Sequence, residues 1–215
     1  MSAASDPPLF VGVIALDGPA ASGKGTIAKR LAARYGLPHL DTGLLYRGVG
    51  AAMRARGAAL ENAAEAARCA ACLDTSTLDD PALRSVSAGQ DASIVAAYPE
   101  VRAALLKVQR DFAARPGGAV IDGRDIGMVV CPTAKRKIFV TADVDVRAKR
   151  RALELSARGE TADLAQIQAA LEERDRRDRE RSVSPLLAPP DAHLLDTTNL
   201  DIERSVARAI AFVER

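Results

Sequence analysis

The segment that most restricts the possible folds is the stretch VGVIALDGPAASGKGT at residues 11–26. Residues 11–17 form a nearly continuous apolar run, a glycine-containing loop follows directly, and a helical pattern begins near Lys24. An apolar run without polar alternation is typical of a strand that is buried on both faces of a parallel sheet. Since such a sheet needs helices over both faces, this segment favours an α/β fold.

The loop after the apolar run matches the G-x-x-x-x-G-K pattern in the context that the pattern requires, a strand before it and a helix after it. Its glycines let successive N–H groups point at a polyphosphate, and Lys24 reaches the β and γ phosphates. Gly25 stands where Ser or Thr usually follows the lysine, so Thr26 is the hydroxyl expected beside Mg²⁺. The sequence therefore predicts a site for ATP and Mg²⁺ formed by Gly18, Pro19, Ala20, Ala21, Ser22, Gly23, Lys24, Gly25 and Thr26.

The remaining chain alternates between short apolar runs and helical patterns, which predicts five parallel strands with helices on both faces. We expect strands at residues 11–17, 39–41, 119–122, 137–142 and 193–196. We expect helices at residues 24–35, 44–56, 100–115, 144–158, 162–181 and 202–215. Ligands of such folds bind at the carboxyl ends of the strands, and the first three strands end at Asp17, Asp41 and Asp122.

Two segments interrupt this alternation. Residues 60–100 lie between the second and third strands and are expected to form an inserted subdomain, while residues 156–165 are expected to form a short lid. Residues 1–9 are mostly small and polar and are expected to be a disordered tail. The prediction is one domain at residues 10–215, whose core consists of residues 10–59 and 101–215.

The charge and aromatic content argue against several partners. The 30 basic and 28 acidic residues leave a formal net charge of +2, which gives no general attraction to nucleic acid or to an anionic membrane. Aromatic residues make up 3% of the chain, too few for base-stacking platforms. No apolar stretch reaches the roughly 18 residues of a membrane helix, and the N-terminus does not resemble a signal peptide. We expect a cytoplasmic protein without nucleic-acid or membrane partners.

The cysteines include one C-x-x-C pair, Cys69 and Cys72, which is compatible with redox chemistry or with half of a zinc site. The pair lies in an alanine-rich helical stretch, and Cys131, His39 and His193 are scattered along the chain. Since structural zinc needs four ligands, packing within a helix is the favoured interpretation.

The phosphate loop alone does not separate kinases from other nucleotide-binding proteins. The N-K-x-D base reader of GTPases does not occur in the sequence. Residues 87–90 resemble the signature of transport ATPases only weakly, and Gly123 stands where a catalytic Glu would follow Asp122. These features favour a kinase.

Further motifs narrow the class. The G-K-G-T ending of the loop resembles nucleoside monophosphate kinases, and three motifs follow it in order: Asp41-Thr42-Gly43 with Tyr46-Arg47, then Gly123-Arg124-Asp125, then RDRRDRER at residues 174–181. Together they resemble the bacterial cytidylate kinase family over about residues 11–215. The resemblance implies a monomeric enzyme that phosphorylates CMP and dCMP with ATP.

The resemblance also implies roles for individual residues. In the family, the phosphate of CMP is held by the residues that match Arg47, Arg124 and Arg181, and the sugar hydroxyls by those that match Arg174 and Asp178. Thr42 also belongs to the implied substrate-binding set. The implied catalytic residues are Lys24, Arg124, Arg177 and Arg181.

Ser93, Arg102 and Asp125 match the cytosine readers of the family. An Arg can donate to O2 and N3 of cytosine, while a carboxylate and a hydroxyl accept from its N4 amine. Uracil reverses the pattern at N3 and O4, which would leave buried polar groups unpaired. The resemblance therefore implies selection of cytosine over uracil.

Three further expectations concern the metal, the phosphate loop and the adenine. Asp122 is expected to orient a water on Mg²⁺, and Asp17 to support the phosphate loop. The adenine of ATP is expected near residues 197–200. These placements are hypotheses.

The charged segment at residues 172–181 has two interpretations. As a solvated helix it would carry i,i+4 ion pairs such as Glu173–Arg177 and Asp175–Arg179. Yet Arg174, Asp178 and Arg181 are spaced i, i+4 and i+7, so they share a face that can meet a ligand. Both interpretations can hold on different faces of one helix.

One feature departs from the family. Cytidylate kinases commonly carry a longer insert with a small antiparallel sheet, whereas residues 73–90 are few, rich in turn residues and show little alternation. The base-reading residues are retained, so CMP remains the expected acceptor. The alternatives are a P-loop kinase that acts on UMP, AMP or another small metabolite, and a non-catalytic ATP-binding regulator.

Overall fold

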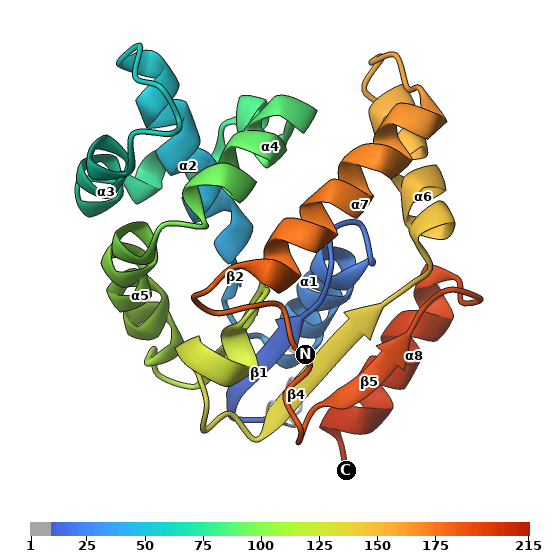
Figure 1. Cartoon of the computed structure of the whole chain (residues 1–215). Helices are drawn as coiled ribbons and strands as arrows, with labels where there is room; N and C mark the ends of the chain where they lie inside the picture. The colour runs from blue at the N-terminus through green and yellow to red at the C-terminus, as the bar shows by residue number, and fades with distance from the viewer. Residues whose placement is uncertain (1–9) are drawn as a thin grey trace, which may run out of the picture.

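The computed structural model describes residues 10–215, and the predicted tail at residues 1–9 lies outside this part. A single five-stranded sheet with the order β2-β3-β1-β4-β5 forms the centre of the molecule (Figure 1). All neighbouring strands run parallel. The strands are β1 Gly12–Asp17, β2 His39–Asp41, β3 Gly118–Gly123, β4 Arg136–Thr141 and β5 His193–Asp196. The predicted five-stranded parallel α/β fold is confirmed.

Helices connect the strands. Those that the sequence predicts are α1 Lys24–Tyr35, α2 Thr42–Ala55, α5 Pro99–Ala113, α6 Val144–Ser156, α7 Leu164–Glu180 and α8 Ile202–Val213. The segment between α2 and α5 adds α3 Ala63–Ala71, the 3₁₀ helices η1 Thr75–Asp79 and η2 Pro81–Arg84, and α4 Val86–Val95. A single π-helical turn, η3 Ile126–Val130, follows β3. None of the helices within residues 10–215 is long and apolar enough to cross a membrane.

The apolar run of β1 contributes buried side chains to the cores on both faces of the sheet. Ile14 and Leu16 of β1 are fully buried in the core that packs against α1 and α8, whereas Ala15 between them belongs to the core on the opposite face. Successive side chains of a strand point to opposite faces, so a strand that is covered on both sides has to be apolar throughout. This packing places the carboxyl end of β1, and the loop after it, at one edge of the sheet.

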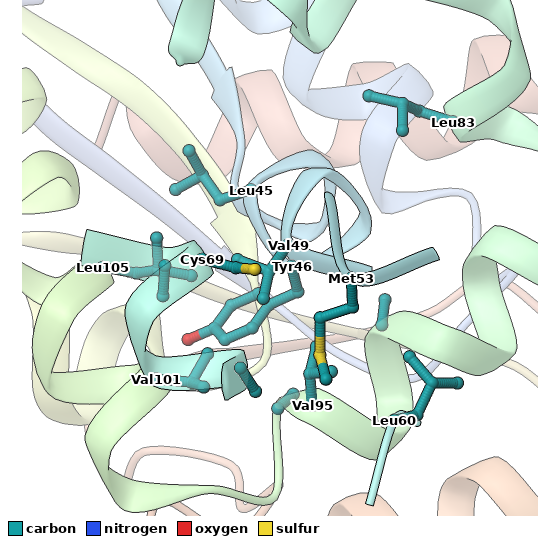
Figure 2. Close-up of a cluster of buried hydrophobic side chains, with 14 of the residues drawn as sticks. Leu45, Tyr46, Val49, Met53, Leu60, Cys69, Leu83, Val95, Val101 and Leu105 are labelled. Carbon is teal, nitrogen blue, oxygen red and sulfur yellow. The ribbon is translucent and has the colours of Figure 1, made fainter. Parts of the chain in front are cut away.

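A second core lies away from the sheet, between α2, α3, α4 and α5 (Figure 2). Tyr46, Val49 and Met53 of α2 pack there against Cys69 of α3 and Leu105 of α5. The predicted insert at residues 60–100 thus shares its core with two helices beyond its predicted bounds, and those bounds stay a prediction. Its residues 75–84 form 3₁₀ turns.

The predicted lid falls between two helices that pack against each other. α6 ends at Ser156, and α7 begins after Asp163, whose carboxylate caps the helix by accepting from the amides of Ala165 and Gln166. Gly159 lies in this connection with φ +74°, a backbone conformation that favours glycine. The closure of this segment over a ligand stays a prediction.

Candidate active site

The phosphate loop leaves β1 through a turn that only glycine fits. Gly18 has φ +147°, and a Cβ at this position would lie 2.0 Å from the carbonyl oxygen of Val140 in β4. The loop then turns into α1 at Gly23, which has φ +89°. Within residues 10–215, the amides of Ser22 and Gly23 donate no hydrogen bond to another group. Free amides at a helix N-terminus are the arrangement that binds phosphate.

Lys24 lies inside the curl of this loop. Its Nζ donates to the carbonyl oxygen of Pro19, 3.1 Å away, and the side chain is buried. Burial, and then the positive charge of Arg124, lower the pKa of Lys24 to about 7. A bound anion would stabilise the protonated form of this lysine and raise its pKa again.

Two carboxylates meet beside the loop, on neighbouring strands. Asp41 and Asp122 are partners in the register of β2 and β3. Burial, and then the charge of Asp122, raise the pKa of Asp41. Asp122 Oδ2 would lie 3.9 Å from a Cβ added to Gly25, and Thr26 lines the same cleft.

These groups fit the Mg²⁺ ion that the sequence predicts. Mg²⁺ prefers carboxylate oxygens, waters and the phosphates of its nucleotide over a complete cage of protein ligands. Within residues 10–215 no three His, Cys, Asp or Glu side chains gather into such a cage. Thr26 and Asp122 are the residues that would hold the ion or its waters.

The cleft around the loop has a volume of about 650 Å³, which is within the usual range for small-molecule sites of about 300–1,000 Å³. At one end it is lined by Thr197, Leu200 and Ile202, the region where the adenine was expected. Arg150 of α6 also lies here and donates to Thr197 Oγ1 and to the carbonyl oxygens of Thr197 and Leu200, at 2.9, 2.6 and 3.2 Å. The adenine placement stays a prediction.

A second, smaller cavity of about 40 Å³ lies beside this cleft. It is lined by most of the predicted acceptor residues: Thr42, Ser93, Arg102, Arg124, Asp125, Arg174, Asp178 and Arg181. Within the part of the chain that the structure describes, four buried polar atoms of these residues have no hydrogen-bond partner: Ser93 Oγ, Arg102 Nε, Arg174 Nε and Arg181 Nη2. Buried polar atoms are seldom left unpaired, so their convergence indicates a polar ligand. A nucleotide needs more space than this cavity offers, so its walls have to move apart on binding.

Two arginines at or near the cavity, Arg174 and Arg47, have lowered pKa values. Burial, and then the charge of Arg124, lower the pKa of Arg174 to about 9. Burial also lowers the pKa of Arg47 to about 10, with Arg151 and Arg124 contributing. Arg124 itself donates from Nε to Asp178, 2.8 Å away. The positive charges that lower the pKa of Arg174 and Arg47 favour the binding of a group with multiple negative charges.

The structure separates some of the predicted residues. Arg177 lines another cavity, of about 130 Å³, with Ser93, Arg47 and Arg174, and does not line the cavity that holds Arg102 and Asp125. The Arg181 Nε donates to the carbonyl oxygen of Ser184 at 2.6 Å. The predicted Glu173–Arg177 pair is present at 3.3 Å.

Two expectations are corrected by the structure. The Asp175 carboxylate pairs with Arg147 of α6, at 2.7 Å, instead of with Arg179 on its own helix, because this side of α7 is buried. Asp17 does not hold the phosphate loop: its two carboxylate oxygens accept from the amides of Ile126 and Gly127, at 2.7 and 2.8 Å. It therefore supports the segment just after Arg124 and Asp125.

Sequence reasoning also missed three side chains of the site: His39, Arg150 and Arg151, all of which line the large cleft. The spacing of Arg147, Arg150 and Arg151, i, i+3 and i+4 on one helix, was an available signal for the two arginines. No sequence signal pointed to His39.

A phosphate loop after the central strand of a five-stranded parallel sheet, next to an arginine-lined cavity for a second ligand, defines a P-loop kinase. The family model for cytidylate kinase matches residues 14–215 of this chain. The chain belongs to the cytidylate kinase family and is a nucleoside monophosphate kinase.

Proteins named cytidylate kinase match nearly the whole length of this chain. The protein named cytidylate kinase from Rhodopseudomonas palustris (strain BisA53) is 59% identical over 202 residues, which are 94% of this chain and 96% of the relative. The protein of the same name from Bradyrhizobium sp. (strain ORS 278) is 57% identical over 94% of this chain and 95% of the relative. Among solved structures, a gluconokinase from Sinorhizobium meliloti 1021 covers 95% of this chain and 92% of its own, with a TM-score of 0.50 and 15% identity. This last likeness supports the fold alone.

Proposed function

We propose that this protein transfers the γ-phosphoryl group of ATP to the phosphate of CMP and of dCMP. The observation that carries this proposal is the set of unpartnered buried atoms of Ser93, Arg102, Arg174 and Arg181 around one cavity, next to the phosphate-loop cleft. The family membership supports the same reaction.

The residues of the cavity divide into two groups. Arg102 and Asp125, with Ser93, come from α5, from the loop after β3 and from α4, and offer the donors and acceptors that complement cytosine. Arg124 and Arg181, with Arg47 in the neighbouring cleft, would provide the positive charge for the acceptor phosphate. Arg174 and Asp178 would bind the sugar hydroxyls. Arg124 lines both cavities, which supports a contact with the donor and the acceptor phosphates together.

Phosphoryl transfer passes through a loose transition state, so the protein contributes mainly positioning and charge stabilisation. Lys24, Arg124, Arg177 and Arg181 would spread the negative charge of the transferring group. Mg²⁺ at Thr26 and Asp122 would neutralise part of the charge on the donor phosphates. No covalent intermediate on the enzyme is required, because the acceptor phosphate oxygen attacks in line.

The finer properties are also proposals. A monomer in the cytoplasm is the expectation from the family resemblance, and sedimentation at micromolar concentration checks the assembly. Opening of the walls formed by α4 and α7, and closure of residues 156–165 over ATP, would let CMP enter and then exclude water.

The experiment that tests the function compares ADP production from ATP and Mg²⁺ with CMP, dCMP, UMP, AMP or no acceptor. We expect strong turnover with CMP and dCMP only. Turnover with UMP or AMP instead would retain the kinase and overturn the roles of Ser93, Arg102 and Asp125 as cytosine readers. ATP binding without any response to acceptors would favour the regulatory alternative.

A further inference from the structure

His39 contacts the carboxylate that faces the phosphate loop. The distance from His39 Nε2 to Asp122 Oδ1 is 2.7 Å. The two side chains lie on neighbouring strands, since His39 pairs with Val120 and Asp41 pairs with Asp122 in the register of β2 and β3. Both belong to the wall of the large cleft.

The direction of this hydrogen bond follows from the chemistry of its partners. An ionised carboxylate only accepts hydrogen bonds, so Nε2 of His39 has to carry the proton that it donates to Asp122. The side chains are 16% and 4% exposed, so the bond is largely shielded from water. A shielded, charge-assisted bond of this kind fixes the orientation of the carboxylate.

The other oxygen of Asp122 is left free for a different contact. Within the described residues, no group donates a hydrogen bond to Oδ2, which lies 3.9 Å from the Cβ position of Gly25. Gly25 and Thr26 form the start of α1, where the metal side of the nucleotide is expected. The neighbouring carboxylate of Asp41 has a different partner, because its Oδ1 accepts from the amide of Gly43 and caps α2.

We propose that His39 is a positioning residue that holds the Asp122 carboxylate with Oδ2 toward Gly25 and Thr26. Because of this, Mg²⁺ strengthens the binding of ATP more than it would without His39. This inference rests on the proposed function, because it assigns His39 to the metal side of the same ATP site. In this role His39 needs no contact of its own with the ion or the nucleotide. It acts on them through Asp122.

The test uses the full chain and measures ATP binding by calorimetry, once with Mg²⁺ and once with EDTA. The quantity of interest is the ratio of the dissociation constant in EDTA to the dissociation constant in Mg²⁺, which states how much Mg²⁺ strengthens ATP binding. Loss of a hydrogen-bond partner of this kind typically costs about 10–100-fold in metal affinity, so we expect His39→Leu to lower the ratio by about tenfold. ATP affinity in EDTA should stay within about twofold, because the loop amides and Lys24 are unchanged.

Further variants make the result specific. His39→Gln, whose amide can donate at a similar reach, should restore most of the wild-type ratio. His39→Leu in an Asp122→Asn background should add nothing to the effect of Asp122→Asn. The control is His193→Gln on β5, where His193 stacks on Phe212 with ring centroids 4.7 Å apart, away from the residues of the cleft. It should leave the ratio unchanged. If His39→Leu does not fold, His39→Asn, whose amide is shorter, replaces it.

In turnover assays, His39→Leu should raise the Mg²⁺ concentration for half-maximal rate and leave the KM for CMP unchanged. An unaltered ratio in His39→Leu, an equal loss of ATP affinity in EDTA, or a failure of His39→Gln to restore the ratio would overturn the role of His39. The proposed function fails separately, if the wild type shows no turnover that depends on CMP. Binding of ATP can still be compared between variants in that case.

Discussion

Arg102 of α5 and Asp125 of the loop after β3 form a buried ion pair, with 2.5 Å between Nη2 and Oδ2. The Arg102 guanidinium lies 5.5 Å from the centre of the Tyr46 ring, and its Nη1 donates to the carbonyl oxygen of Ala96. The pair therefore joins the second core to the sheet at the floor of the acceptor cavity. Both side chains are held in place before any base is bound.

The first prediction concerns this pair. Asp125→Ala or Arg102→Ala should raise the KM for CMP by about 10–100-fold, because a charged partner of the base is lost and its buried counterpart is left unpaired. The KM for ATP should change by no more than about threefold, since neither residue lines the large cleft. Steady-state kinetics with each substrate varied in turn measures the two constants. Equal damage to both, in a folded variant, would contradict the base-reading role.

A suitable control is Arg68→Ala on α3, the helix that packs against α5. Arg68 forms an exposed ion pair with Glu65 on α3, and exposed pairs contribute little to stability. This variant should keep both Michaelis constants, which separates the loss of a base reader from a general effect of removing an arginine.

The second prediction is that Lys24→Ala abolishes transfer. Lys24 is buried at the centre of the loop, and removal of one group that stabilises the transition-state charge typically costs at least about 10²–10³-fold in kcat. The measurement is single-turnover ADP formation with saturating ATP and CMP. A variant that still binds CMP but transfers at the wild-type rate would exclude Lys24 from the catalytic set.

The third prediction follows from the low pKa of Lys24, about 7 in the ligand-free protein. At pH 8 most of these side chains are neutral, and the phosphates of ATP favour the charged form. Binding of ATP should therefore take up nearly one proton at pH 8 and almost none at pH 6. Calorimetry in two buffers with different heats of ionisation counts the protons. The uptake should disappear in Lys24→Met, and an unchanged uptake in this variant would assign the proton to another group.

The strands and the phosphate loop could be predicted because their signals are local. Residues 11–16 are apolar at every position, and the loop that follows has glycines where the backbone needs them, at Gly18 and Gly23. The predicted acceptor residues came from motifs in the sequence, and most of them line one cavity.

Other features could not be predicted, because they depend on contacts between distant segments. α4 has no clear apolar periodicity: its buried positions include Gly89, Asp91 and Ser93, which are small or polar. Its place is determined by packing against α2, where Arg54 pairs with Asp91 at 2.8 Å. The contact between His39 and Asp122 joins residues that are 83 positions apart.

The fourth prediction concerns Asp17. Burial raises the pKa of its carboxyl from 3.8 to about 6, despite the hydrogen bonds from Ile126 and Gly127. The folded state therefore binds this proton more tightly than the unfolded state does, so its contribution to stability is present below about pH 4 and is lost as the pH rises through 6. Asp17→Asn lacks this titration, so between pH 4 and 7 the free energy of unfolding of the wild type should fall by about 2 kcal/mol relative to that of Asp17→Asn.

Urea unfolding of both proteins at several pH values measures this difference. A shift of the opposite sign would mean that the two amide hydrogen bonds outweigh the cost of burying the charge. Because the two proteins differ only at residue 17, the pH at which the difference changes reports the titration of this carboxyl.

The last prediction concerns the buried pair of Arg147 and Asp175, which ties the phosphate loop to α7. Arg147 donates to Asp175 Oδ2 at 2.7 Å, to the carbonyl oxygen of Ala142 at 2.8 Å and to that of Ala20 at 3.2 Å. Both side chains are 6% exposed. Removal of one partner leaves the other charge buried and unpaired, so Arg147→Met and Asp175→Leu should each cost about 3–5 kcal/mol.

The double variant should cost much less than the sum of the two single variants, because no unpaired charge remains. Chemical unfolding of the four proteins in this cycle gives the coupling energy directly. The matched control is the exposed pair of Arg30 and Glu203, at 2.8 Å, whose coupling should not exceed about 1 kcal/mol. A similar coupling in both cycles would mean that burial does not strengthen the Arg147–Asp175 pair, and that α7 depends on its apolar contacts for its position beside the loop.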